Sequence, residues 1–270
     1  MVLKKAEKQD MAAVKRLWQS RFEDGTAGFA DFVTERMGER IYIAIEGDDI
    51  AAMLIAAATL EYSGRKGFYL YSACTAPSYR KKGYMKALTD FAIASEKENG
   101  ASFCVLKPTN DELFDFWAKL GFTGTSSVRE FTFDIKKNIW QSADFDIVTA
   151  GRFSAVREKF ADENIVHYSK KDYELFTRYL YTFGGSTAEN ENAYAVYYIE
   201  NDILQVKEIF ARSTTHAIAL LQAVRERTGC EKANICVPEN STLFLGEGSV
   251  KKRYAFTGLD DNAYINLMFE

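Results

Sequence analysis

The clearest sign of the fold is a short stretch of the chain that reads Ser72-Ala73-Cys74-Thr75-Ala76-Pro77-Ser78-Tyr79-Arg80-Lys81-Lys82-Gly83-Tyr84-Met85. The pattern predicts a strand that runs into a short basic loop, and a helix that the loop opens. A helix N-terminus leaves backbone N–H groups without partners and carries the positive end of the helix dipole. Gly83 has no side chain, so phosphate oxygens can approach its backbone closely. The stretch is therefore typical of a pyrophosphate-binding loop.

The sequence around this loop predicts a domain with helices packed on a mixed sheet. Lys81–Asn99 has the periodicity of an amphipathic helix, and Gly100 ends it. The expected strands are Val2–Ala6, Ile41–Ile45, Ile50–Tyr62, Phe68–Thr75, Ser102–Leu106, Phe122 and Val128–Ile135. The other expected helices are one that carries Met11, Val14, Leu17 and Trp18 on one face, one over Gly28–Gly38, and one that a Thr109/Glu112 capping box opens and Gly121 ends.

The second half of the chain repeats part of this order after a polar stretch, Lys136–Asp144. Strands are expected over Phe145–Thr149, Ala193–Ile199, Ile203–Ala211, Ala233–Val237, Arg253–Phe256 and Ala263–Phe269, and helices over Arg152–Phe160, Lys171–Phe183 and Ser213–Thr228. The repeated order predicts two domains, 1–138 and 144–270, related by duplication. An unrelated α+β domain is the alternative for the second half.

The basic loop resembles the acyl-CoA pyrophosphate loop of the GNAT acetyltransferases, whose pattern is Arg/Gln-x-x-Gly-x-Gly/Ala. Arg80 and Gly83 match this pattern, and Met85 stands where the family has a small residue. A later stretch is similar to the family's strand-and-Asn motif at Asn110, and to its Tyr-x-Lys-x-Gly-Phe helix end, where Trp117 replaces the tyrosine. The resemblance covers residues 1 to about 135 and implies the α/β GNAT acyl-CoA N-acyltransferase fold.

This resemblance implies an N-acetyltransferase that moves an acetyl group from acetyl-CoA to a primary amine of a small molecule or peptide. The residues that it implies for coenzyme A binding are Cys74, Thr75, Arg80, Lys81, Lys82, Gly83, Tyr84, Met85 and Asn110. It also implies an oxyanion donor on the backbone around Cys74–Thr75. The side chains considered for catalysis are Tyr69, Cys74 and Trp117, although an indole can only donate a hydrogen bond and cannot act as the family's acid. Glu61 and Glu23 are further acidic candidates.

In the second half, Phe210–His216 stands at the place of the basic loop and lacks the Arg-x-x-Gly pattern. Ser213 or Thr214 is expected to cap the following helix. Gly229–Asn240 again resembles the family's strand and Asn motif. The second half is thus similar to a degenerate GNAT-like domain that has kept the scaffold and lost the coenzyme A site.

Composition and charge exclude several classes of protein. The chain has 38 acidic and 34 basic side chains, and a net charge of -4 argues against a nucleic-acid binder. The sequence has no uncharged apolar run long enough to predict a membrane span, and we expect a cytoplasmic protein. Two histidines and four cysteines without a CxxC pair predict no metal site. A catalytically silent acyl-CoA-binding pseudoenzyme remains the alternative to an enzyme, and a transferase with a bulkier acyl donor is a third reading.

Overall fold

The computed structural model describes residues 1–22, 36–139, 144–160, 164–243 and 245–266. The chain forms two compact units. Unit 1 consists of Met1–Gly124 and Tyr254–Asp260, and unit 2 consists of Thr125–Arg253 and Asp261–Glu270. These units differ from the predicted ranges 1–138 and 144–270 because a strand near the C-terminus pairs inside unit 1. Each unit combines helices with a mixed sheet, which confirms the predicted α/β class.

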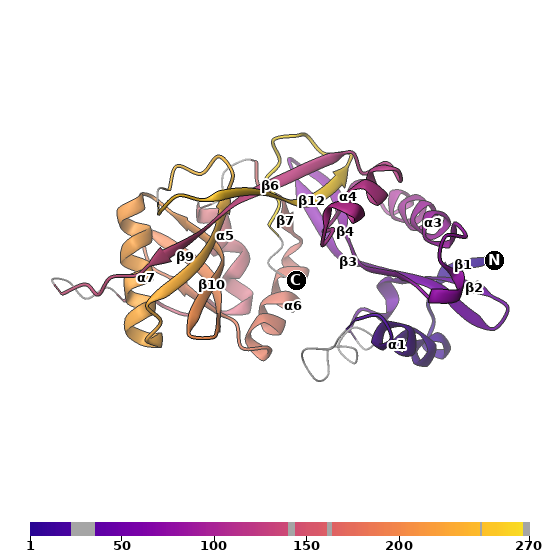
Figure 1. Cartoon of the computed structure of the whole chain (residues 1–270), viewed down its shortest axis with the longest axis horizontal. Helices are drawn as coiled ribbons and strands as arrows, with labels where there is room; N and C mark the ends of the chain where they lie inside the picture. Colours follow the sequence, from indigo (N-terminus) through magenta and orange to yellow (C-terminus); the bar gives the residue numbers. More distant parts are fainter. Residues whose placement is uncertain (23–35, 140–143, 161–163, 244, 267–270) are drawn as a thin grey trace. The chain divides into compact units, whose positions relative to one another are not determined.

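The sheet of unit 1 has the strand order β1-β2-β3-β4-β5-β12 (Figure 1). The strands are β1 (Val2–Lys5), β2 (Ile41–Glu46), β3 (Asp49–Tyr62), β4 (Arg65–Thr75), β5 (Ala101–Leu106) and β12 (Ser249–Thr257), of which unit 1 holds residues 254–257. Only the β4–β5 pair is parallel among the described pairs of this unit. A parallel pair needs a crossover connection, and the helix α3 (Tyr84–Glu98) supplies it.

Helices cover both faces of this sheet. Alternate residues of β4 point to opposite faces, and Phe68 and Leu70 lie in one core cluster with Leu88 of α3 and Trp117 of α4 (Asp111–Ala118). On the other face, α1 (Met11–Gln19) packs, and the ring of its Trp18 lies 6.2 Å from that of Tyr71. The short 3-10 turns of this unit are η1 (Lys8–Asp10), η2 (Gly38–Arg40) and η3 (Pro77–Tyr79).

The strands predicted for the first half are confirmed except at Phe122, which lies before the start of β6 at Gly124. One helix cap also differs. Asn110 rather than Thr109 is the N-cap of α4, since its side chain accepts a hydrogen bond from the backbone N–H of Leu113 at 2.9 Å. The Thr109/Glu112 capping box was therefore wrong by one residue. Most of the helix expected over Gly28–Gly38 lies outside the described residues.

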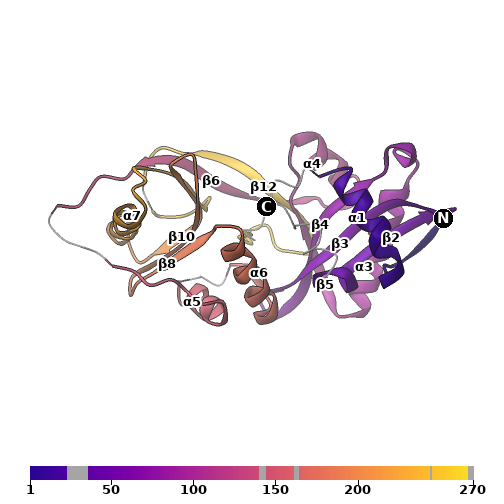
Figure 2. The same cartoon turned by 90° about the horizontal axis from the view of Figure 1, so that it is seen from below.

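Unit 2 repeats the central order of unit 1. Its sheet runs β12-β6-β11-β10-β9-β8, with β12 represented by residues 249–253 (Figure 2). The strands are β6 (Gly124–Asp134), β8 (Ser186–Glu189), β9 (Ala193–Glu200), β10 (Ile203–Ala211) and β11 (Lys232–Pro238). As in unit 1, the third strand of the repeat pairs parallel to the strand that follows its helix: β10 and β11, connected by α7 (Thr214–Thr228).

Helix α7 packs on one face of this sheet, where it shares a core with Leu204, Val206 and Ile235. The other helices of the unit are α5 (Phe153–Phe160) and α6 (Lys170–Thr182), and η4 (Ala150–Arg152) is a 3-10 turn. Two predicted strands were wrong. Within Phe145–Thr149 only an isolated bridge from Asp146 to Glu189 forms, and the described part of Ala263–Phe269 has only the bridge from Tyr264 to Ile165.

The sequence patterns also missed two strands, β7 (His167–Tyr168) and β8. Both are too short to show an alternating pattern, and β8 contains the weak strand formers Ser186 and Glu189. These strands form because neighbouring chain segments pair with them, which local propensity does not report. The linker expected over Lys136–Asp144 is described only in part.

Candidate functional site

The candidate site lies where β4 leaves its parallel neighbour. The register of β4 with β5 runs from Lys66↔Ala101 to Leu70↔Leu106. Beyond Leu70, β4 continues to Thr75, and on its other side it still pairs with β3 through Ala52↔Thr75. The edge of β4 from residue 71 to 75 is therefore outside the described ladder with β5. Such an edge offers backbone hydrogen-bonding groups to an extended ligand.

A β-bulge interrupts β4 at this point. Tyr71 faces Ile55 and Cys74 faces Met53, so two residues of β4 oppose one residue of β3. Ser72, one of the two, has a φ of 52°, which a non-glycine residue adopts at a cost of roughly 1–2 kcal/mol. Bulges are common beside active sites because they turn backbone groups and side chains toward a ligand. The bulge is thus a marker of function that no feature of the sequence indicated.

The loop after β4 ends in a helix start without a side-chain cap. Gly83 is the N-cap of α3, has a φ of 85°, and provides no side-chain hydrogen bond. A Cβ built at Gly83 would meet no atom within 4 Å. The N–H groups of the first turn of α3 are therefore available to an anion at an open surface. Arg80, Lys81 and Lys82 are exposed beside it, and Arg80 Nε donates to the carbonyl of Thr75 at 3.4 Å.

Not every residue of the basic stretch turns its side chain toward this surface. Met85 is 9% exposed and lies in the core under α3, so only its backbone can contribute to binding there. The ring of Tyr84 packs at 5.4 Å against that of Tyr79, and Lys82 Nζ lies 5.6 Å from the Tyr79 ring centroid. These contacts give the loop a cationic and aromatic rim. Asn110 is exposed, and its side-chain oxygen is engaged in capping α4.

Cys74 is a buried thiol on the strand of the candidate site. Burial raises its pKa to about 12, although the charges of Arg21 and Arg80 act in the opposite direction. A thiol becomes a nucleophile only as the thiolate. The side chain of Cys74 is therefore protonated at neutral pH, and only its backbone N–H and C=O have the chemistry that the candidate site requires.

The two aromatic candidates for catalysis are both buried. Trp117 is 6% exposed and packs with Phe122 at a ring distance of 5.4 Å. Tyr69 is 2% exposed, and its ring lies 5.7 Å from that of Tyr71. Tyr71 is more accessible than Tyr69 and stands directly before the bulged Ser72. The alternation of a strand could have indicated Tyr71, because it shares a face with Tyr69.

Unit 2 has the same bulged strand but a closed helix start. The β10–β11 register ends at Val206↔Ile235, and the β9–β10 register shifts between Val206 and Glu208. Ser213 caps α7: its hydroxyl accepts from the backbone N–H of His216 at 3.3 Å and lies 3.1 Å from the His216 ring. The predicted cap at Ser213 is confirmed. Because the chain itself uses this N-terminus, it is less suited to an anion than that of α3.

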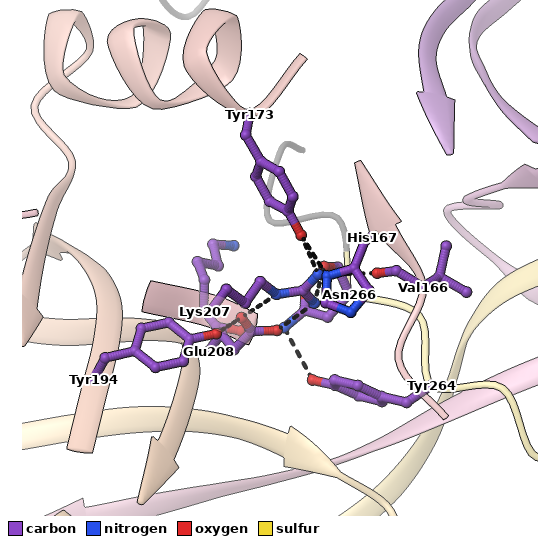
Figure 3. A network of polar contacts seen from close by, with 9 residues as sticks. Val166, His167, Tyr173, Tyr194, Lys207, Glu208, Tyr264 and Asn266 are labelled. Atoms are coloured by element: carbon purple, nitrogen blue, oxygen red, sulfur yellow. Dashed lines mark hydrogen bonds and ion pairs between the residues drawn. The ribbon is translucent and has the colours of Figure 1, made fainter. Parts of the chain in front are cut away.

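Behind the bulge of β10, a buried ion pair fills the face opposite α7 (Figure 3). Arg157 of α5 donates to both carboxylate oxygens of Glu208, at 2.8 and 2.9 Å, and both side chains have no exposed surface. Tyr194 also donates to Glu208. Arg157 further donates to the carbonyls of Val166 and Asn266 and to the Tyr173 hydroxyl, at 2.9, 3.2 and 2.7 Å. Around Glu208, this face of unit 2 is thus a buried polar core rather than an open site.

Within the described part of the chain, no group of three or more His, Cys, Asp or Glu side chains could hold a metal ion. No described helix is both long enough and apolar enough to cross a membrane.

Comparison with known proteins agrees with this geometry. Residues 2–123 match the family model described as acetyltransferase (GNAT) domain. A GCN5-related N-acetyltransferase from Kribbella flavida superposes with a TM-score of 0.74 at 16% identity, over 94% of this chain and 70% of that chain. A second, from Anabaena variabilis, gives a TM-score of 0.71 at 14% identity, over 94% and 72%.

Eis1 from Mycobacterium abscessus has a TM-score of 0.67 at 11% identity, over 95% of this chain and 73% of that chain. At these identities the likeness concerns the fold, and it extends over both units. No curated protein matched the sequence.

Proposed function

We propose that this protein is an N-acetyltransferase that transfers an acetyl group from acetyl-CoA to a primary amine. The observation that carries this proposal is the continuity of the bulged, partly unpaired end of β4 with the uncapped start of α3 at Gly83. The unpaired end of β4 can form backbone hydrogen bonds with the amide groups of the pantetheine part of coenzyme A. The start of α3 can bind its pyrophosphate. The match of residues 2–123 to the GNAT domain supports the same assignment.

The residues present fit coenzyme A. The open space at Gly83 and the first-turn N–H groups of α3 suit phosphate oxygens, and Arg80, Lys81 and Lys82 add positive charge. The backbone of Cys74 and Thr75 continues this surface along β4. When bound, acetyl-CoA supplies an activated thioester carbonyl. A backbone N–H near the Ser72 bulge is the donor that we assign to the carbonyl oxygen as negative charge develops there.

Proton transfer has two separate requirements in this site. The acceptor amine must lose a proton, and Tyr69 and Tyr71 are the tyrosine hydroxyls nearest the bulge along β4. The leaving thiolate has no tyrosine to protonate it, because Trp117 occupies the position where the family has that tyrosine. A thiol pKa of about 8.5 makes a thiolate a tolerable leaving group near neutral pH. Absence of a general acid typically lowers a rate by about 10²–10⁴-fold.

The second candidate function is a catalytically silent acyl-CoA-binding protein that senses acyl-CoA or supports a partner. The burial of Trp117 in the core favours it, since this position then contributes packing and no proton. Both functions need the same binding loop. They differ only in turnover.

The binding loop is tested with a matched pair of glycine variants, Gly83→Ala and Gly100→Ala. Both glycines have left-handed backbones, with φ of 85° and 90°, and both have free space at the Cβ position. They flank the two ends of α3, so each substitution should lower stability by a similar amount, roughly 1 kcal/mol. Only Gly83→Ala should also weaken acetyl-CoA binding, by about tenfold or more, when calorimetry compares both with the parent.

The outcomes separate the alternatives. Binding by the parent and by Gly100→Ala but not by Gly83→Ala supports the loop assignment. Release of free thiol with a panel of primary amines then favours the enzyme, and binding without thiol release favours the silent protein. No binding of acetyl-CoA or of coenzyme A by the parent chain contradicts both functions.

A further inference from the structure

A row of aromatic rings lies beside the candidate site, on the face of the unit 1 sheet that α1 covers. Tyr69 and Tyr71 share this face of β4, and their ring centroids are 5.7 Å apart. The ring of Trp18 lies 6.2 Å from that of Tyr71 and 4.5 Å from that of Phe22, which follows the end of α1. The row therefore connects the strand before the bulge with the end of the helix.

The row belongs partly to the core and partly to the surface. Trp18 and Tyr69 are each 2% exposed, whereas Tyr71 and Phe22 are only half-buried. The two buried rings pack against Tyr71, and Trp18 also packs against Phe22. The accessible parts of Tyr71 and Phe22 can contact a bound molecule, and aromatic surfaces of this kind pack well against a flat apolar ring.

The α1 face is the side from which an acceptor can approach the bulge. On the opposite face of β4, Phe68 and Leu70 are buried in the core with residues of α3 and α4. The bulged Ser72 is half-buried and directly follows Tyr71. A group that packs against Tyr71 is thus next to the backbone to which we assign the oxyanion donor.

The charge near this end of β4 is positive. Burial raises the pKa of the Cys74 thiol to about 12, and the charges of Arg21 and Arg80 act in the opposite direction, so both guanidinium groups lie near Cys74. Arg21 is exposed, and its backbone N–H donates to the carbonyl of Trp18 at 2.9 Å. Arg80 belongs to the loop assigned to pyrophosphate, which leaves Arg21 for the acceptor. A second ammonium group on the acceptor would be repelled here, and a carboxylate would be attracted.

We propose that the acceptor is an aromatic amino acid, whose ring packs against Tyr71 and Phe22 and whose carboxylate pairs with Arg21. This inference rests on the proposed acetyl transfer and names its substrate class. Transfer forms a bond between the amine nitrogen and the acetyl carbon and breaks the thioester C–S bond, and the amine proton passes to the released thiol. Ring, amine and carboxylate are neighbours in such an amino acid, as the aromatic row, the bulge and Arg21 are in unit 1.

Three acceptors separate the contribution of the ring from that of the carboxylate. L-Phenylalanine has both groups, phenethylamine lacks the carboxylate, and L-alanine lacks the ring. Thiol release from acetyl-CoA by the whole protein gives kcat/KM for each acceptor. We expect L-phenylalanine to exceed each of the other two by roughly tenfold or more.

Two pairs of variants assign these preferences to residues. Arg21→Gln should lower kcat/KM for L-phenylalanine by about tenfold and change that for phenethylamine by less than about twofold, because only the first has a carboxylate to pair. Its control is Arg16→Gln, an exposed position on α1. Phe22→Ala should lower kcat/KM for the two acceptors with a ring and spare L-alanine. Its control is Phe116→Ala on α4, where the ring is likewise accessible and packs 5.2 Å from that of Trp117.

Calorimetry with acetyl-CoA checks that each variant keeps the donor site, and thermal unfolding checks that it is folded. The inference is overturned if phenethylamine or L-alanine reacts as well as L-phenylalanine, or if each control variant acts like its partner. Thiol release with other amines but not with L-phenylalanine also overturns it, and acetyl transfer then stands. Acetyl-CoA binding without thiol release from any amine contradicts acetyl transfer and the inference together.

Discussion

Individual residues of the candidate site have different relations to their surroundings. Gly83 is required by its backbone: its positive φ and open surface suit a residue without a side chain. Met85 and Trp117 stand at positions of the GNAT motifs, yet both side chains pack in the core of unit 1. The thiol of Cys74 is chemically reactive in general, but here it is buried. Residue type alone therefore did not distinguish side chains that can contact a ligand from those that pack in the core. The burial of each side chain distinguishes them.

Cys74 is predicted to be inert in the folded protein. With a pKa of about 12, roughly one thiol in 10⁴ is ionised at pH 8, so iodoacetamide should leave Cys74 unmodified. Incubation with acetyl-CoA should likewise produce no Cys74 acyl-enzyme. Peptide mass spectrometry measures both, and the unfolded protein, in which the thiol titrates normally, is the control. Rapid labelling of Cys74 under folded conditions would falsify the prediction.

The same shift has a consequence for alkaline stability. Burial raises the pKa of Cys74 to about 12 in the folded state, whereas the thiol of the unfolded chain has its ordinary pKa of 9.0. Below pH 9 both states are protonated and the thiol makes no difference. Above pH 9 the thiol of the unfolded state ionises, which stabilises the unfolded state. The free energy of unfolding therefore decreases as the pH rises from 9 toward 12.

At the scale of elements, the two units share a bulged central strand and differ in what lies beside it. In unit 1, β4 presents Ser72 at the bulge, and α3 begins with an open glycine cap. In unit 2, α7 is capped by Ser213, and the bulge of β10 leads to the buried Arg157–Glu208 pair. The common scaffold thus holds a candidate ligand site in one unit and a polar core in the other.

The Arg157–Glu208 pair is predicted to be costly to break. Glu208→Gln or Arg157→Met each leaves one partner of a fully buried pair uncompensated, which should lower the free energy of unfolding by about 3–5 kcal/mol. The double variant Arg157→Met/Glu208→Leu should lose less than the two single losses added together. Urea denaturation and a double-mutant cycle measure the coupling.

An exposed ion pair provides the control for this cycle. Lys86 and Asp90 on α3 approach to 2.6 Å, but their side chains are 62% and 56% exposed. Lys86→Met should therefore change stability by no more than about 0.5 kcal/mol. A loss below about 1 kcal/mol for Glu208→Gln, comparable with that of Lys86→Met, would contradict the structural role of the buried pair.

At the scale of the whole molecule, the two units are interleaved in the sequence. Unit 1 needs residues 254–260, which follow nearly all of unit 2 along the chain. Of these, residues 254–257 belong to β12, which runs antiparallel to β5 with Ala255 opposite Leu106. Tyr254, Ala255 and Phe256 are at most 1% exposed there. The unit is therefore not a separable N-terminal fragment.

A fragment of residues 1–138 is predicted not to fold cooperatively. It lacks the buried aromatic side chain of Phe256, whose truncation alone typically costs about 3–5 kcal/mol, and it exposes the edge of β5. Such a loss is comparable with the total stability of a domain, about 5–15 kcal/mol. Circular dichroism with thermal unfolding measures this. Residues 1–124 joined to 254–260 through a long flexible linker should regain a cooperative transition.

A fragment of residues 1–138 that unfolds cooperatively at the temperature of the intact protein would show that β12 adds nothing to unit 1. The interleaving also affects how the role of unit 2 is examined. Removal of residues 145–270 takes away part of unit 1 together with unit 2. Activity lost in that deletion is therefore no measure of what unit 2 contributes to acceptor binding.

Adjacent residues carried the information for most helices, most strands and the basic loop. Pro77 and Gly83 act through their own backbone angles, and the pattern of α3 follows from residues three and four apart. Such local constraints are legible in one sequence. They were enough to predict an α/β fold and a basic loop between β4 and α3. The GNAT-like first half was predicted from the resemblance of its motifs to the family.

The remaining features depend on residues far apart in the chain. The pairing of Ala255 with Leu106, the bulge at Ser72 and the Arg157–Glu208 pair each arise from packing between elements that no local pattern connects. The side chains of Thr132, Asn234 and Gln205 likewise meet only through the register of three strands. Long-range pairing is selected by the burial of the whole core. For this reason the pairing of β12 with β5 and the buried ion pair of unit 2 became visible only in the folded chain.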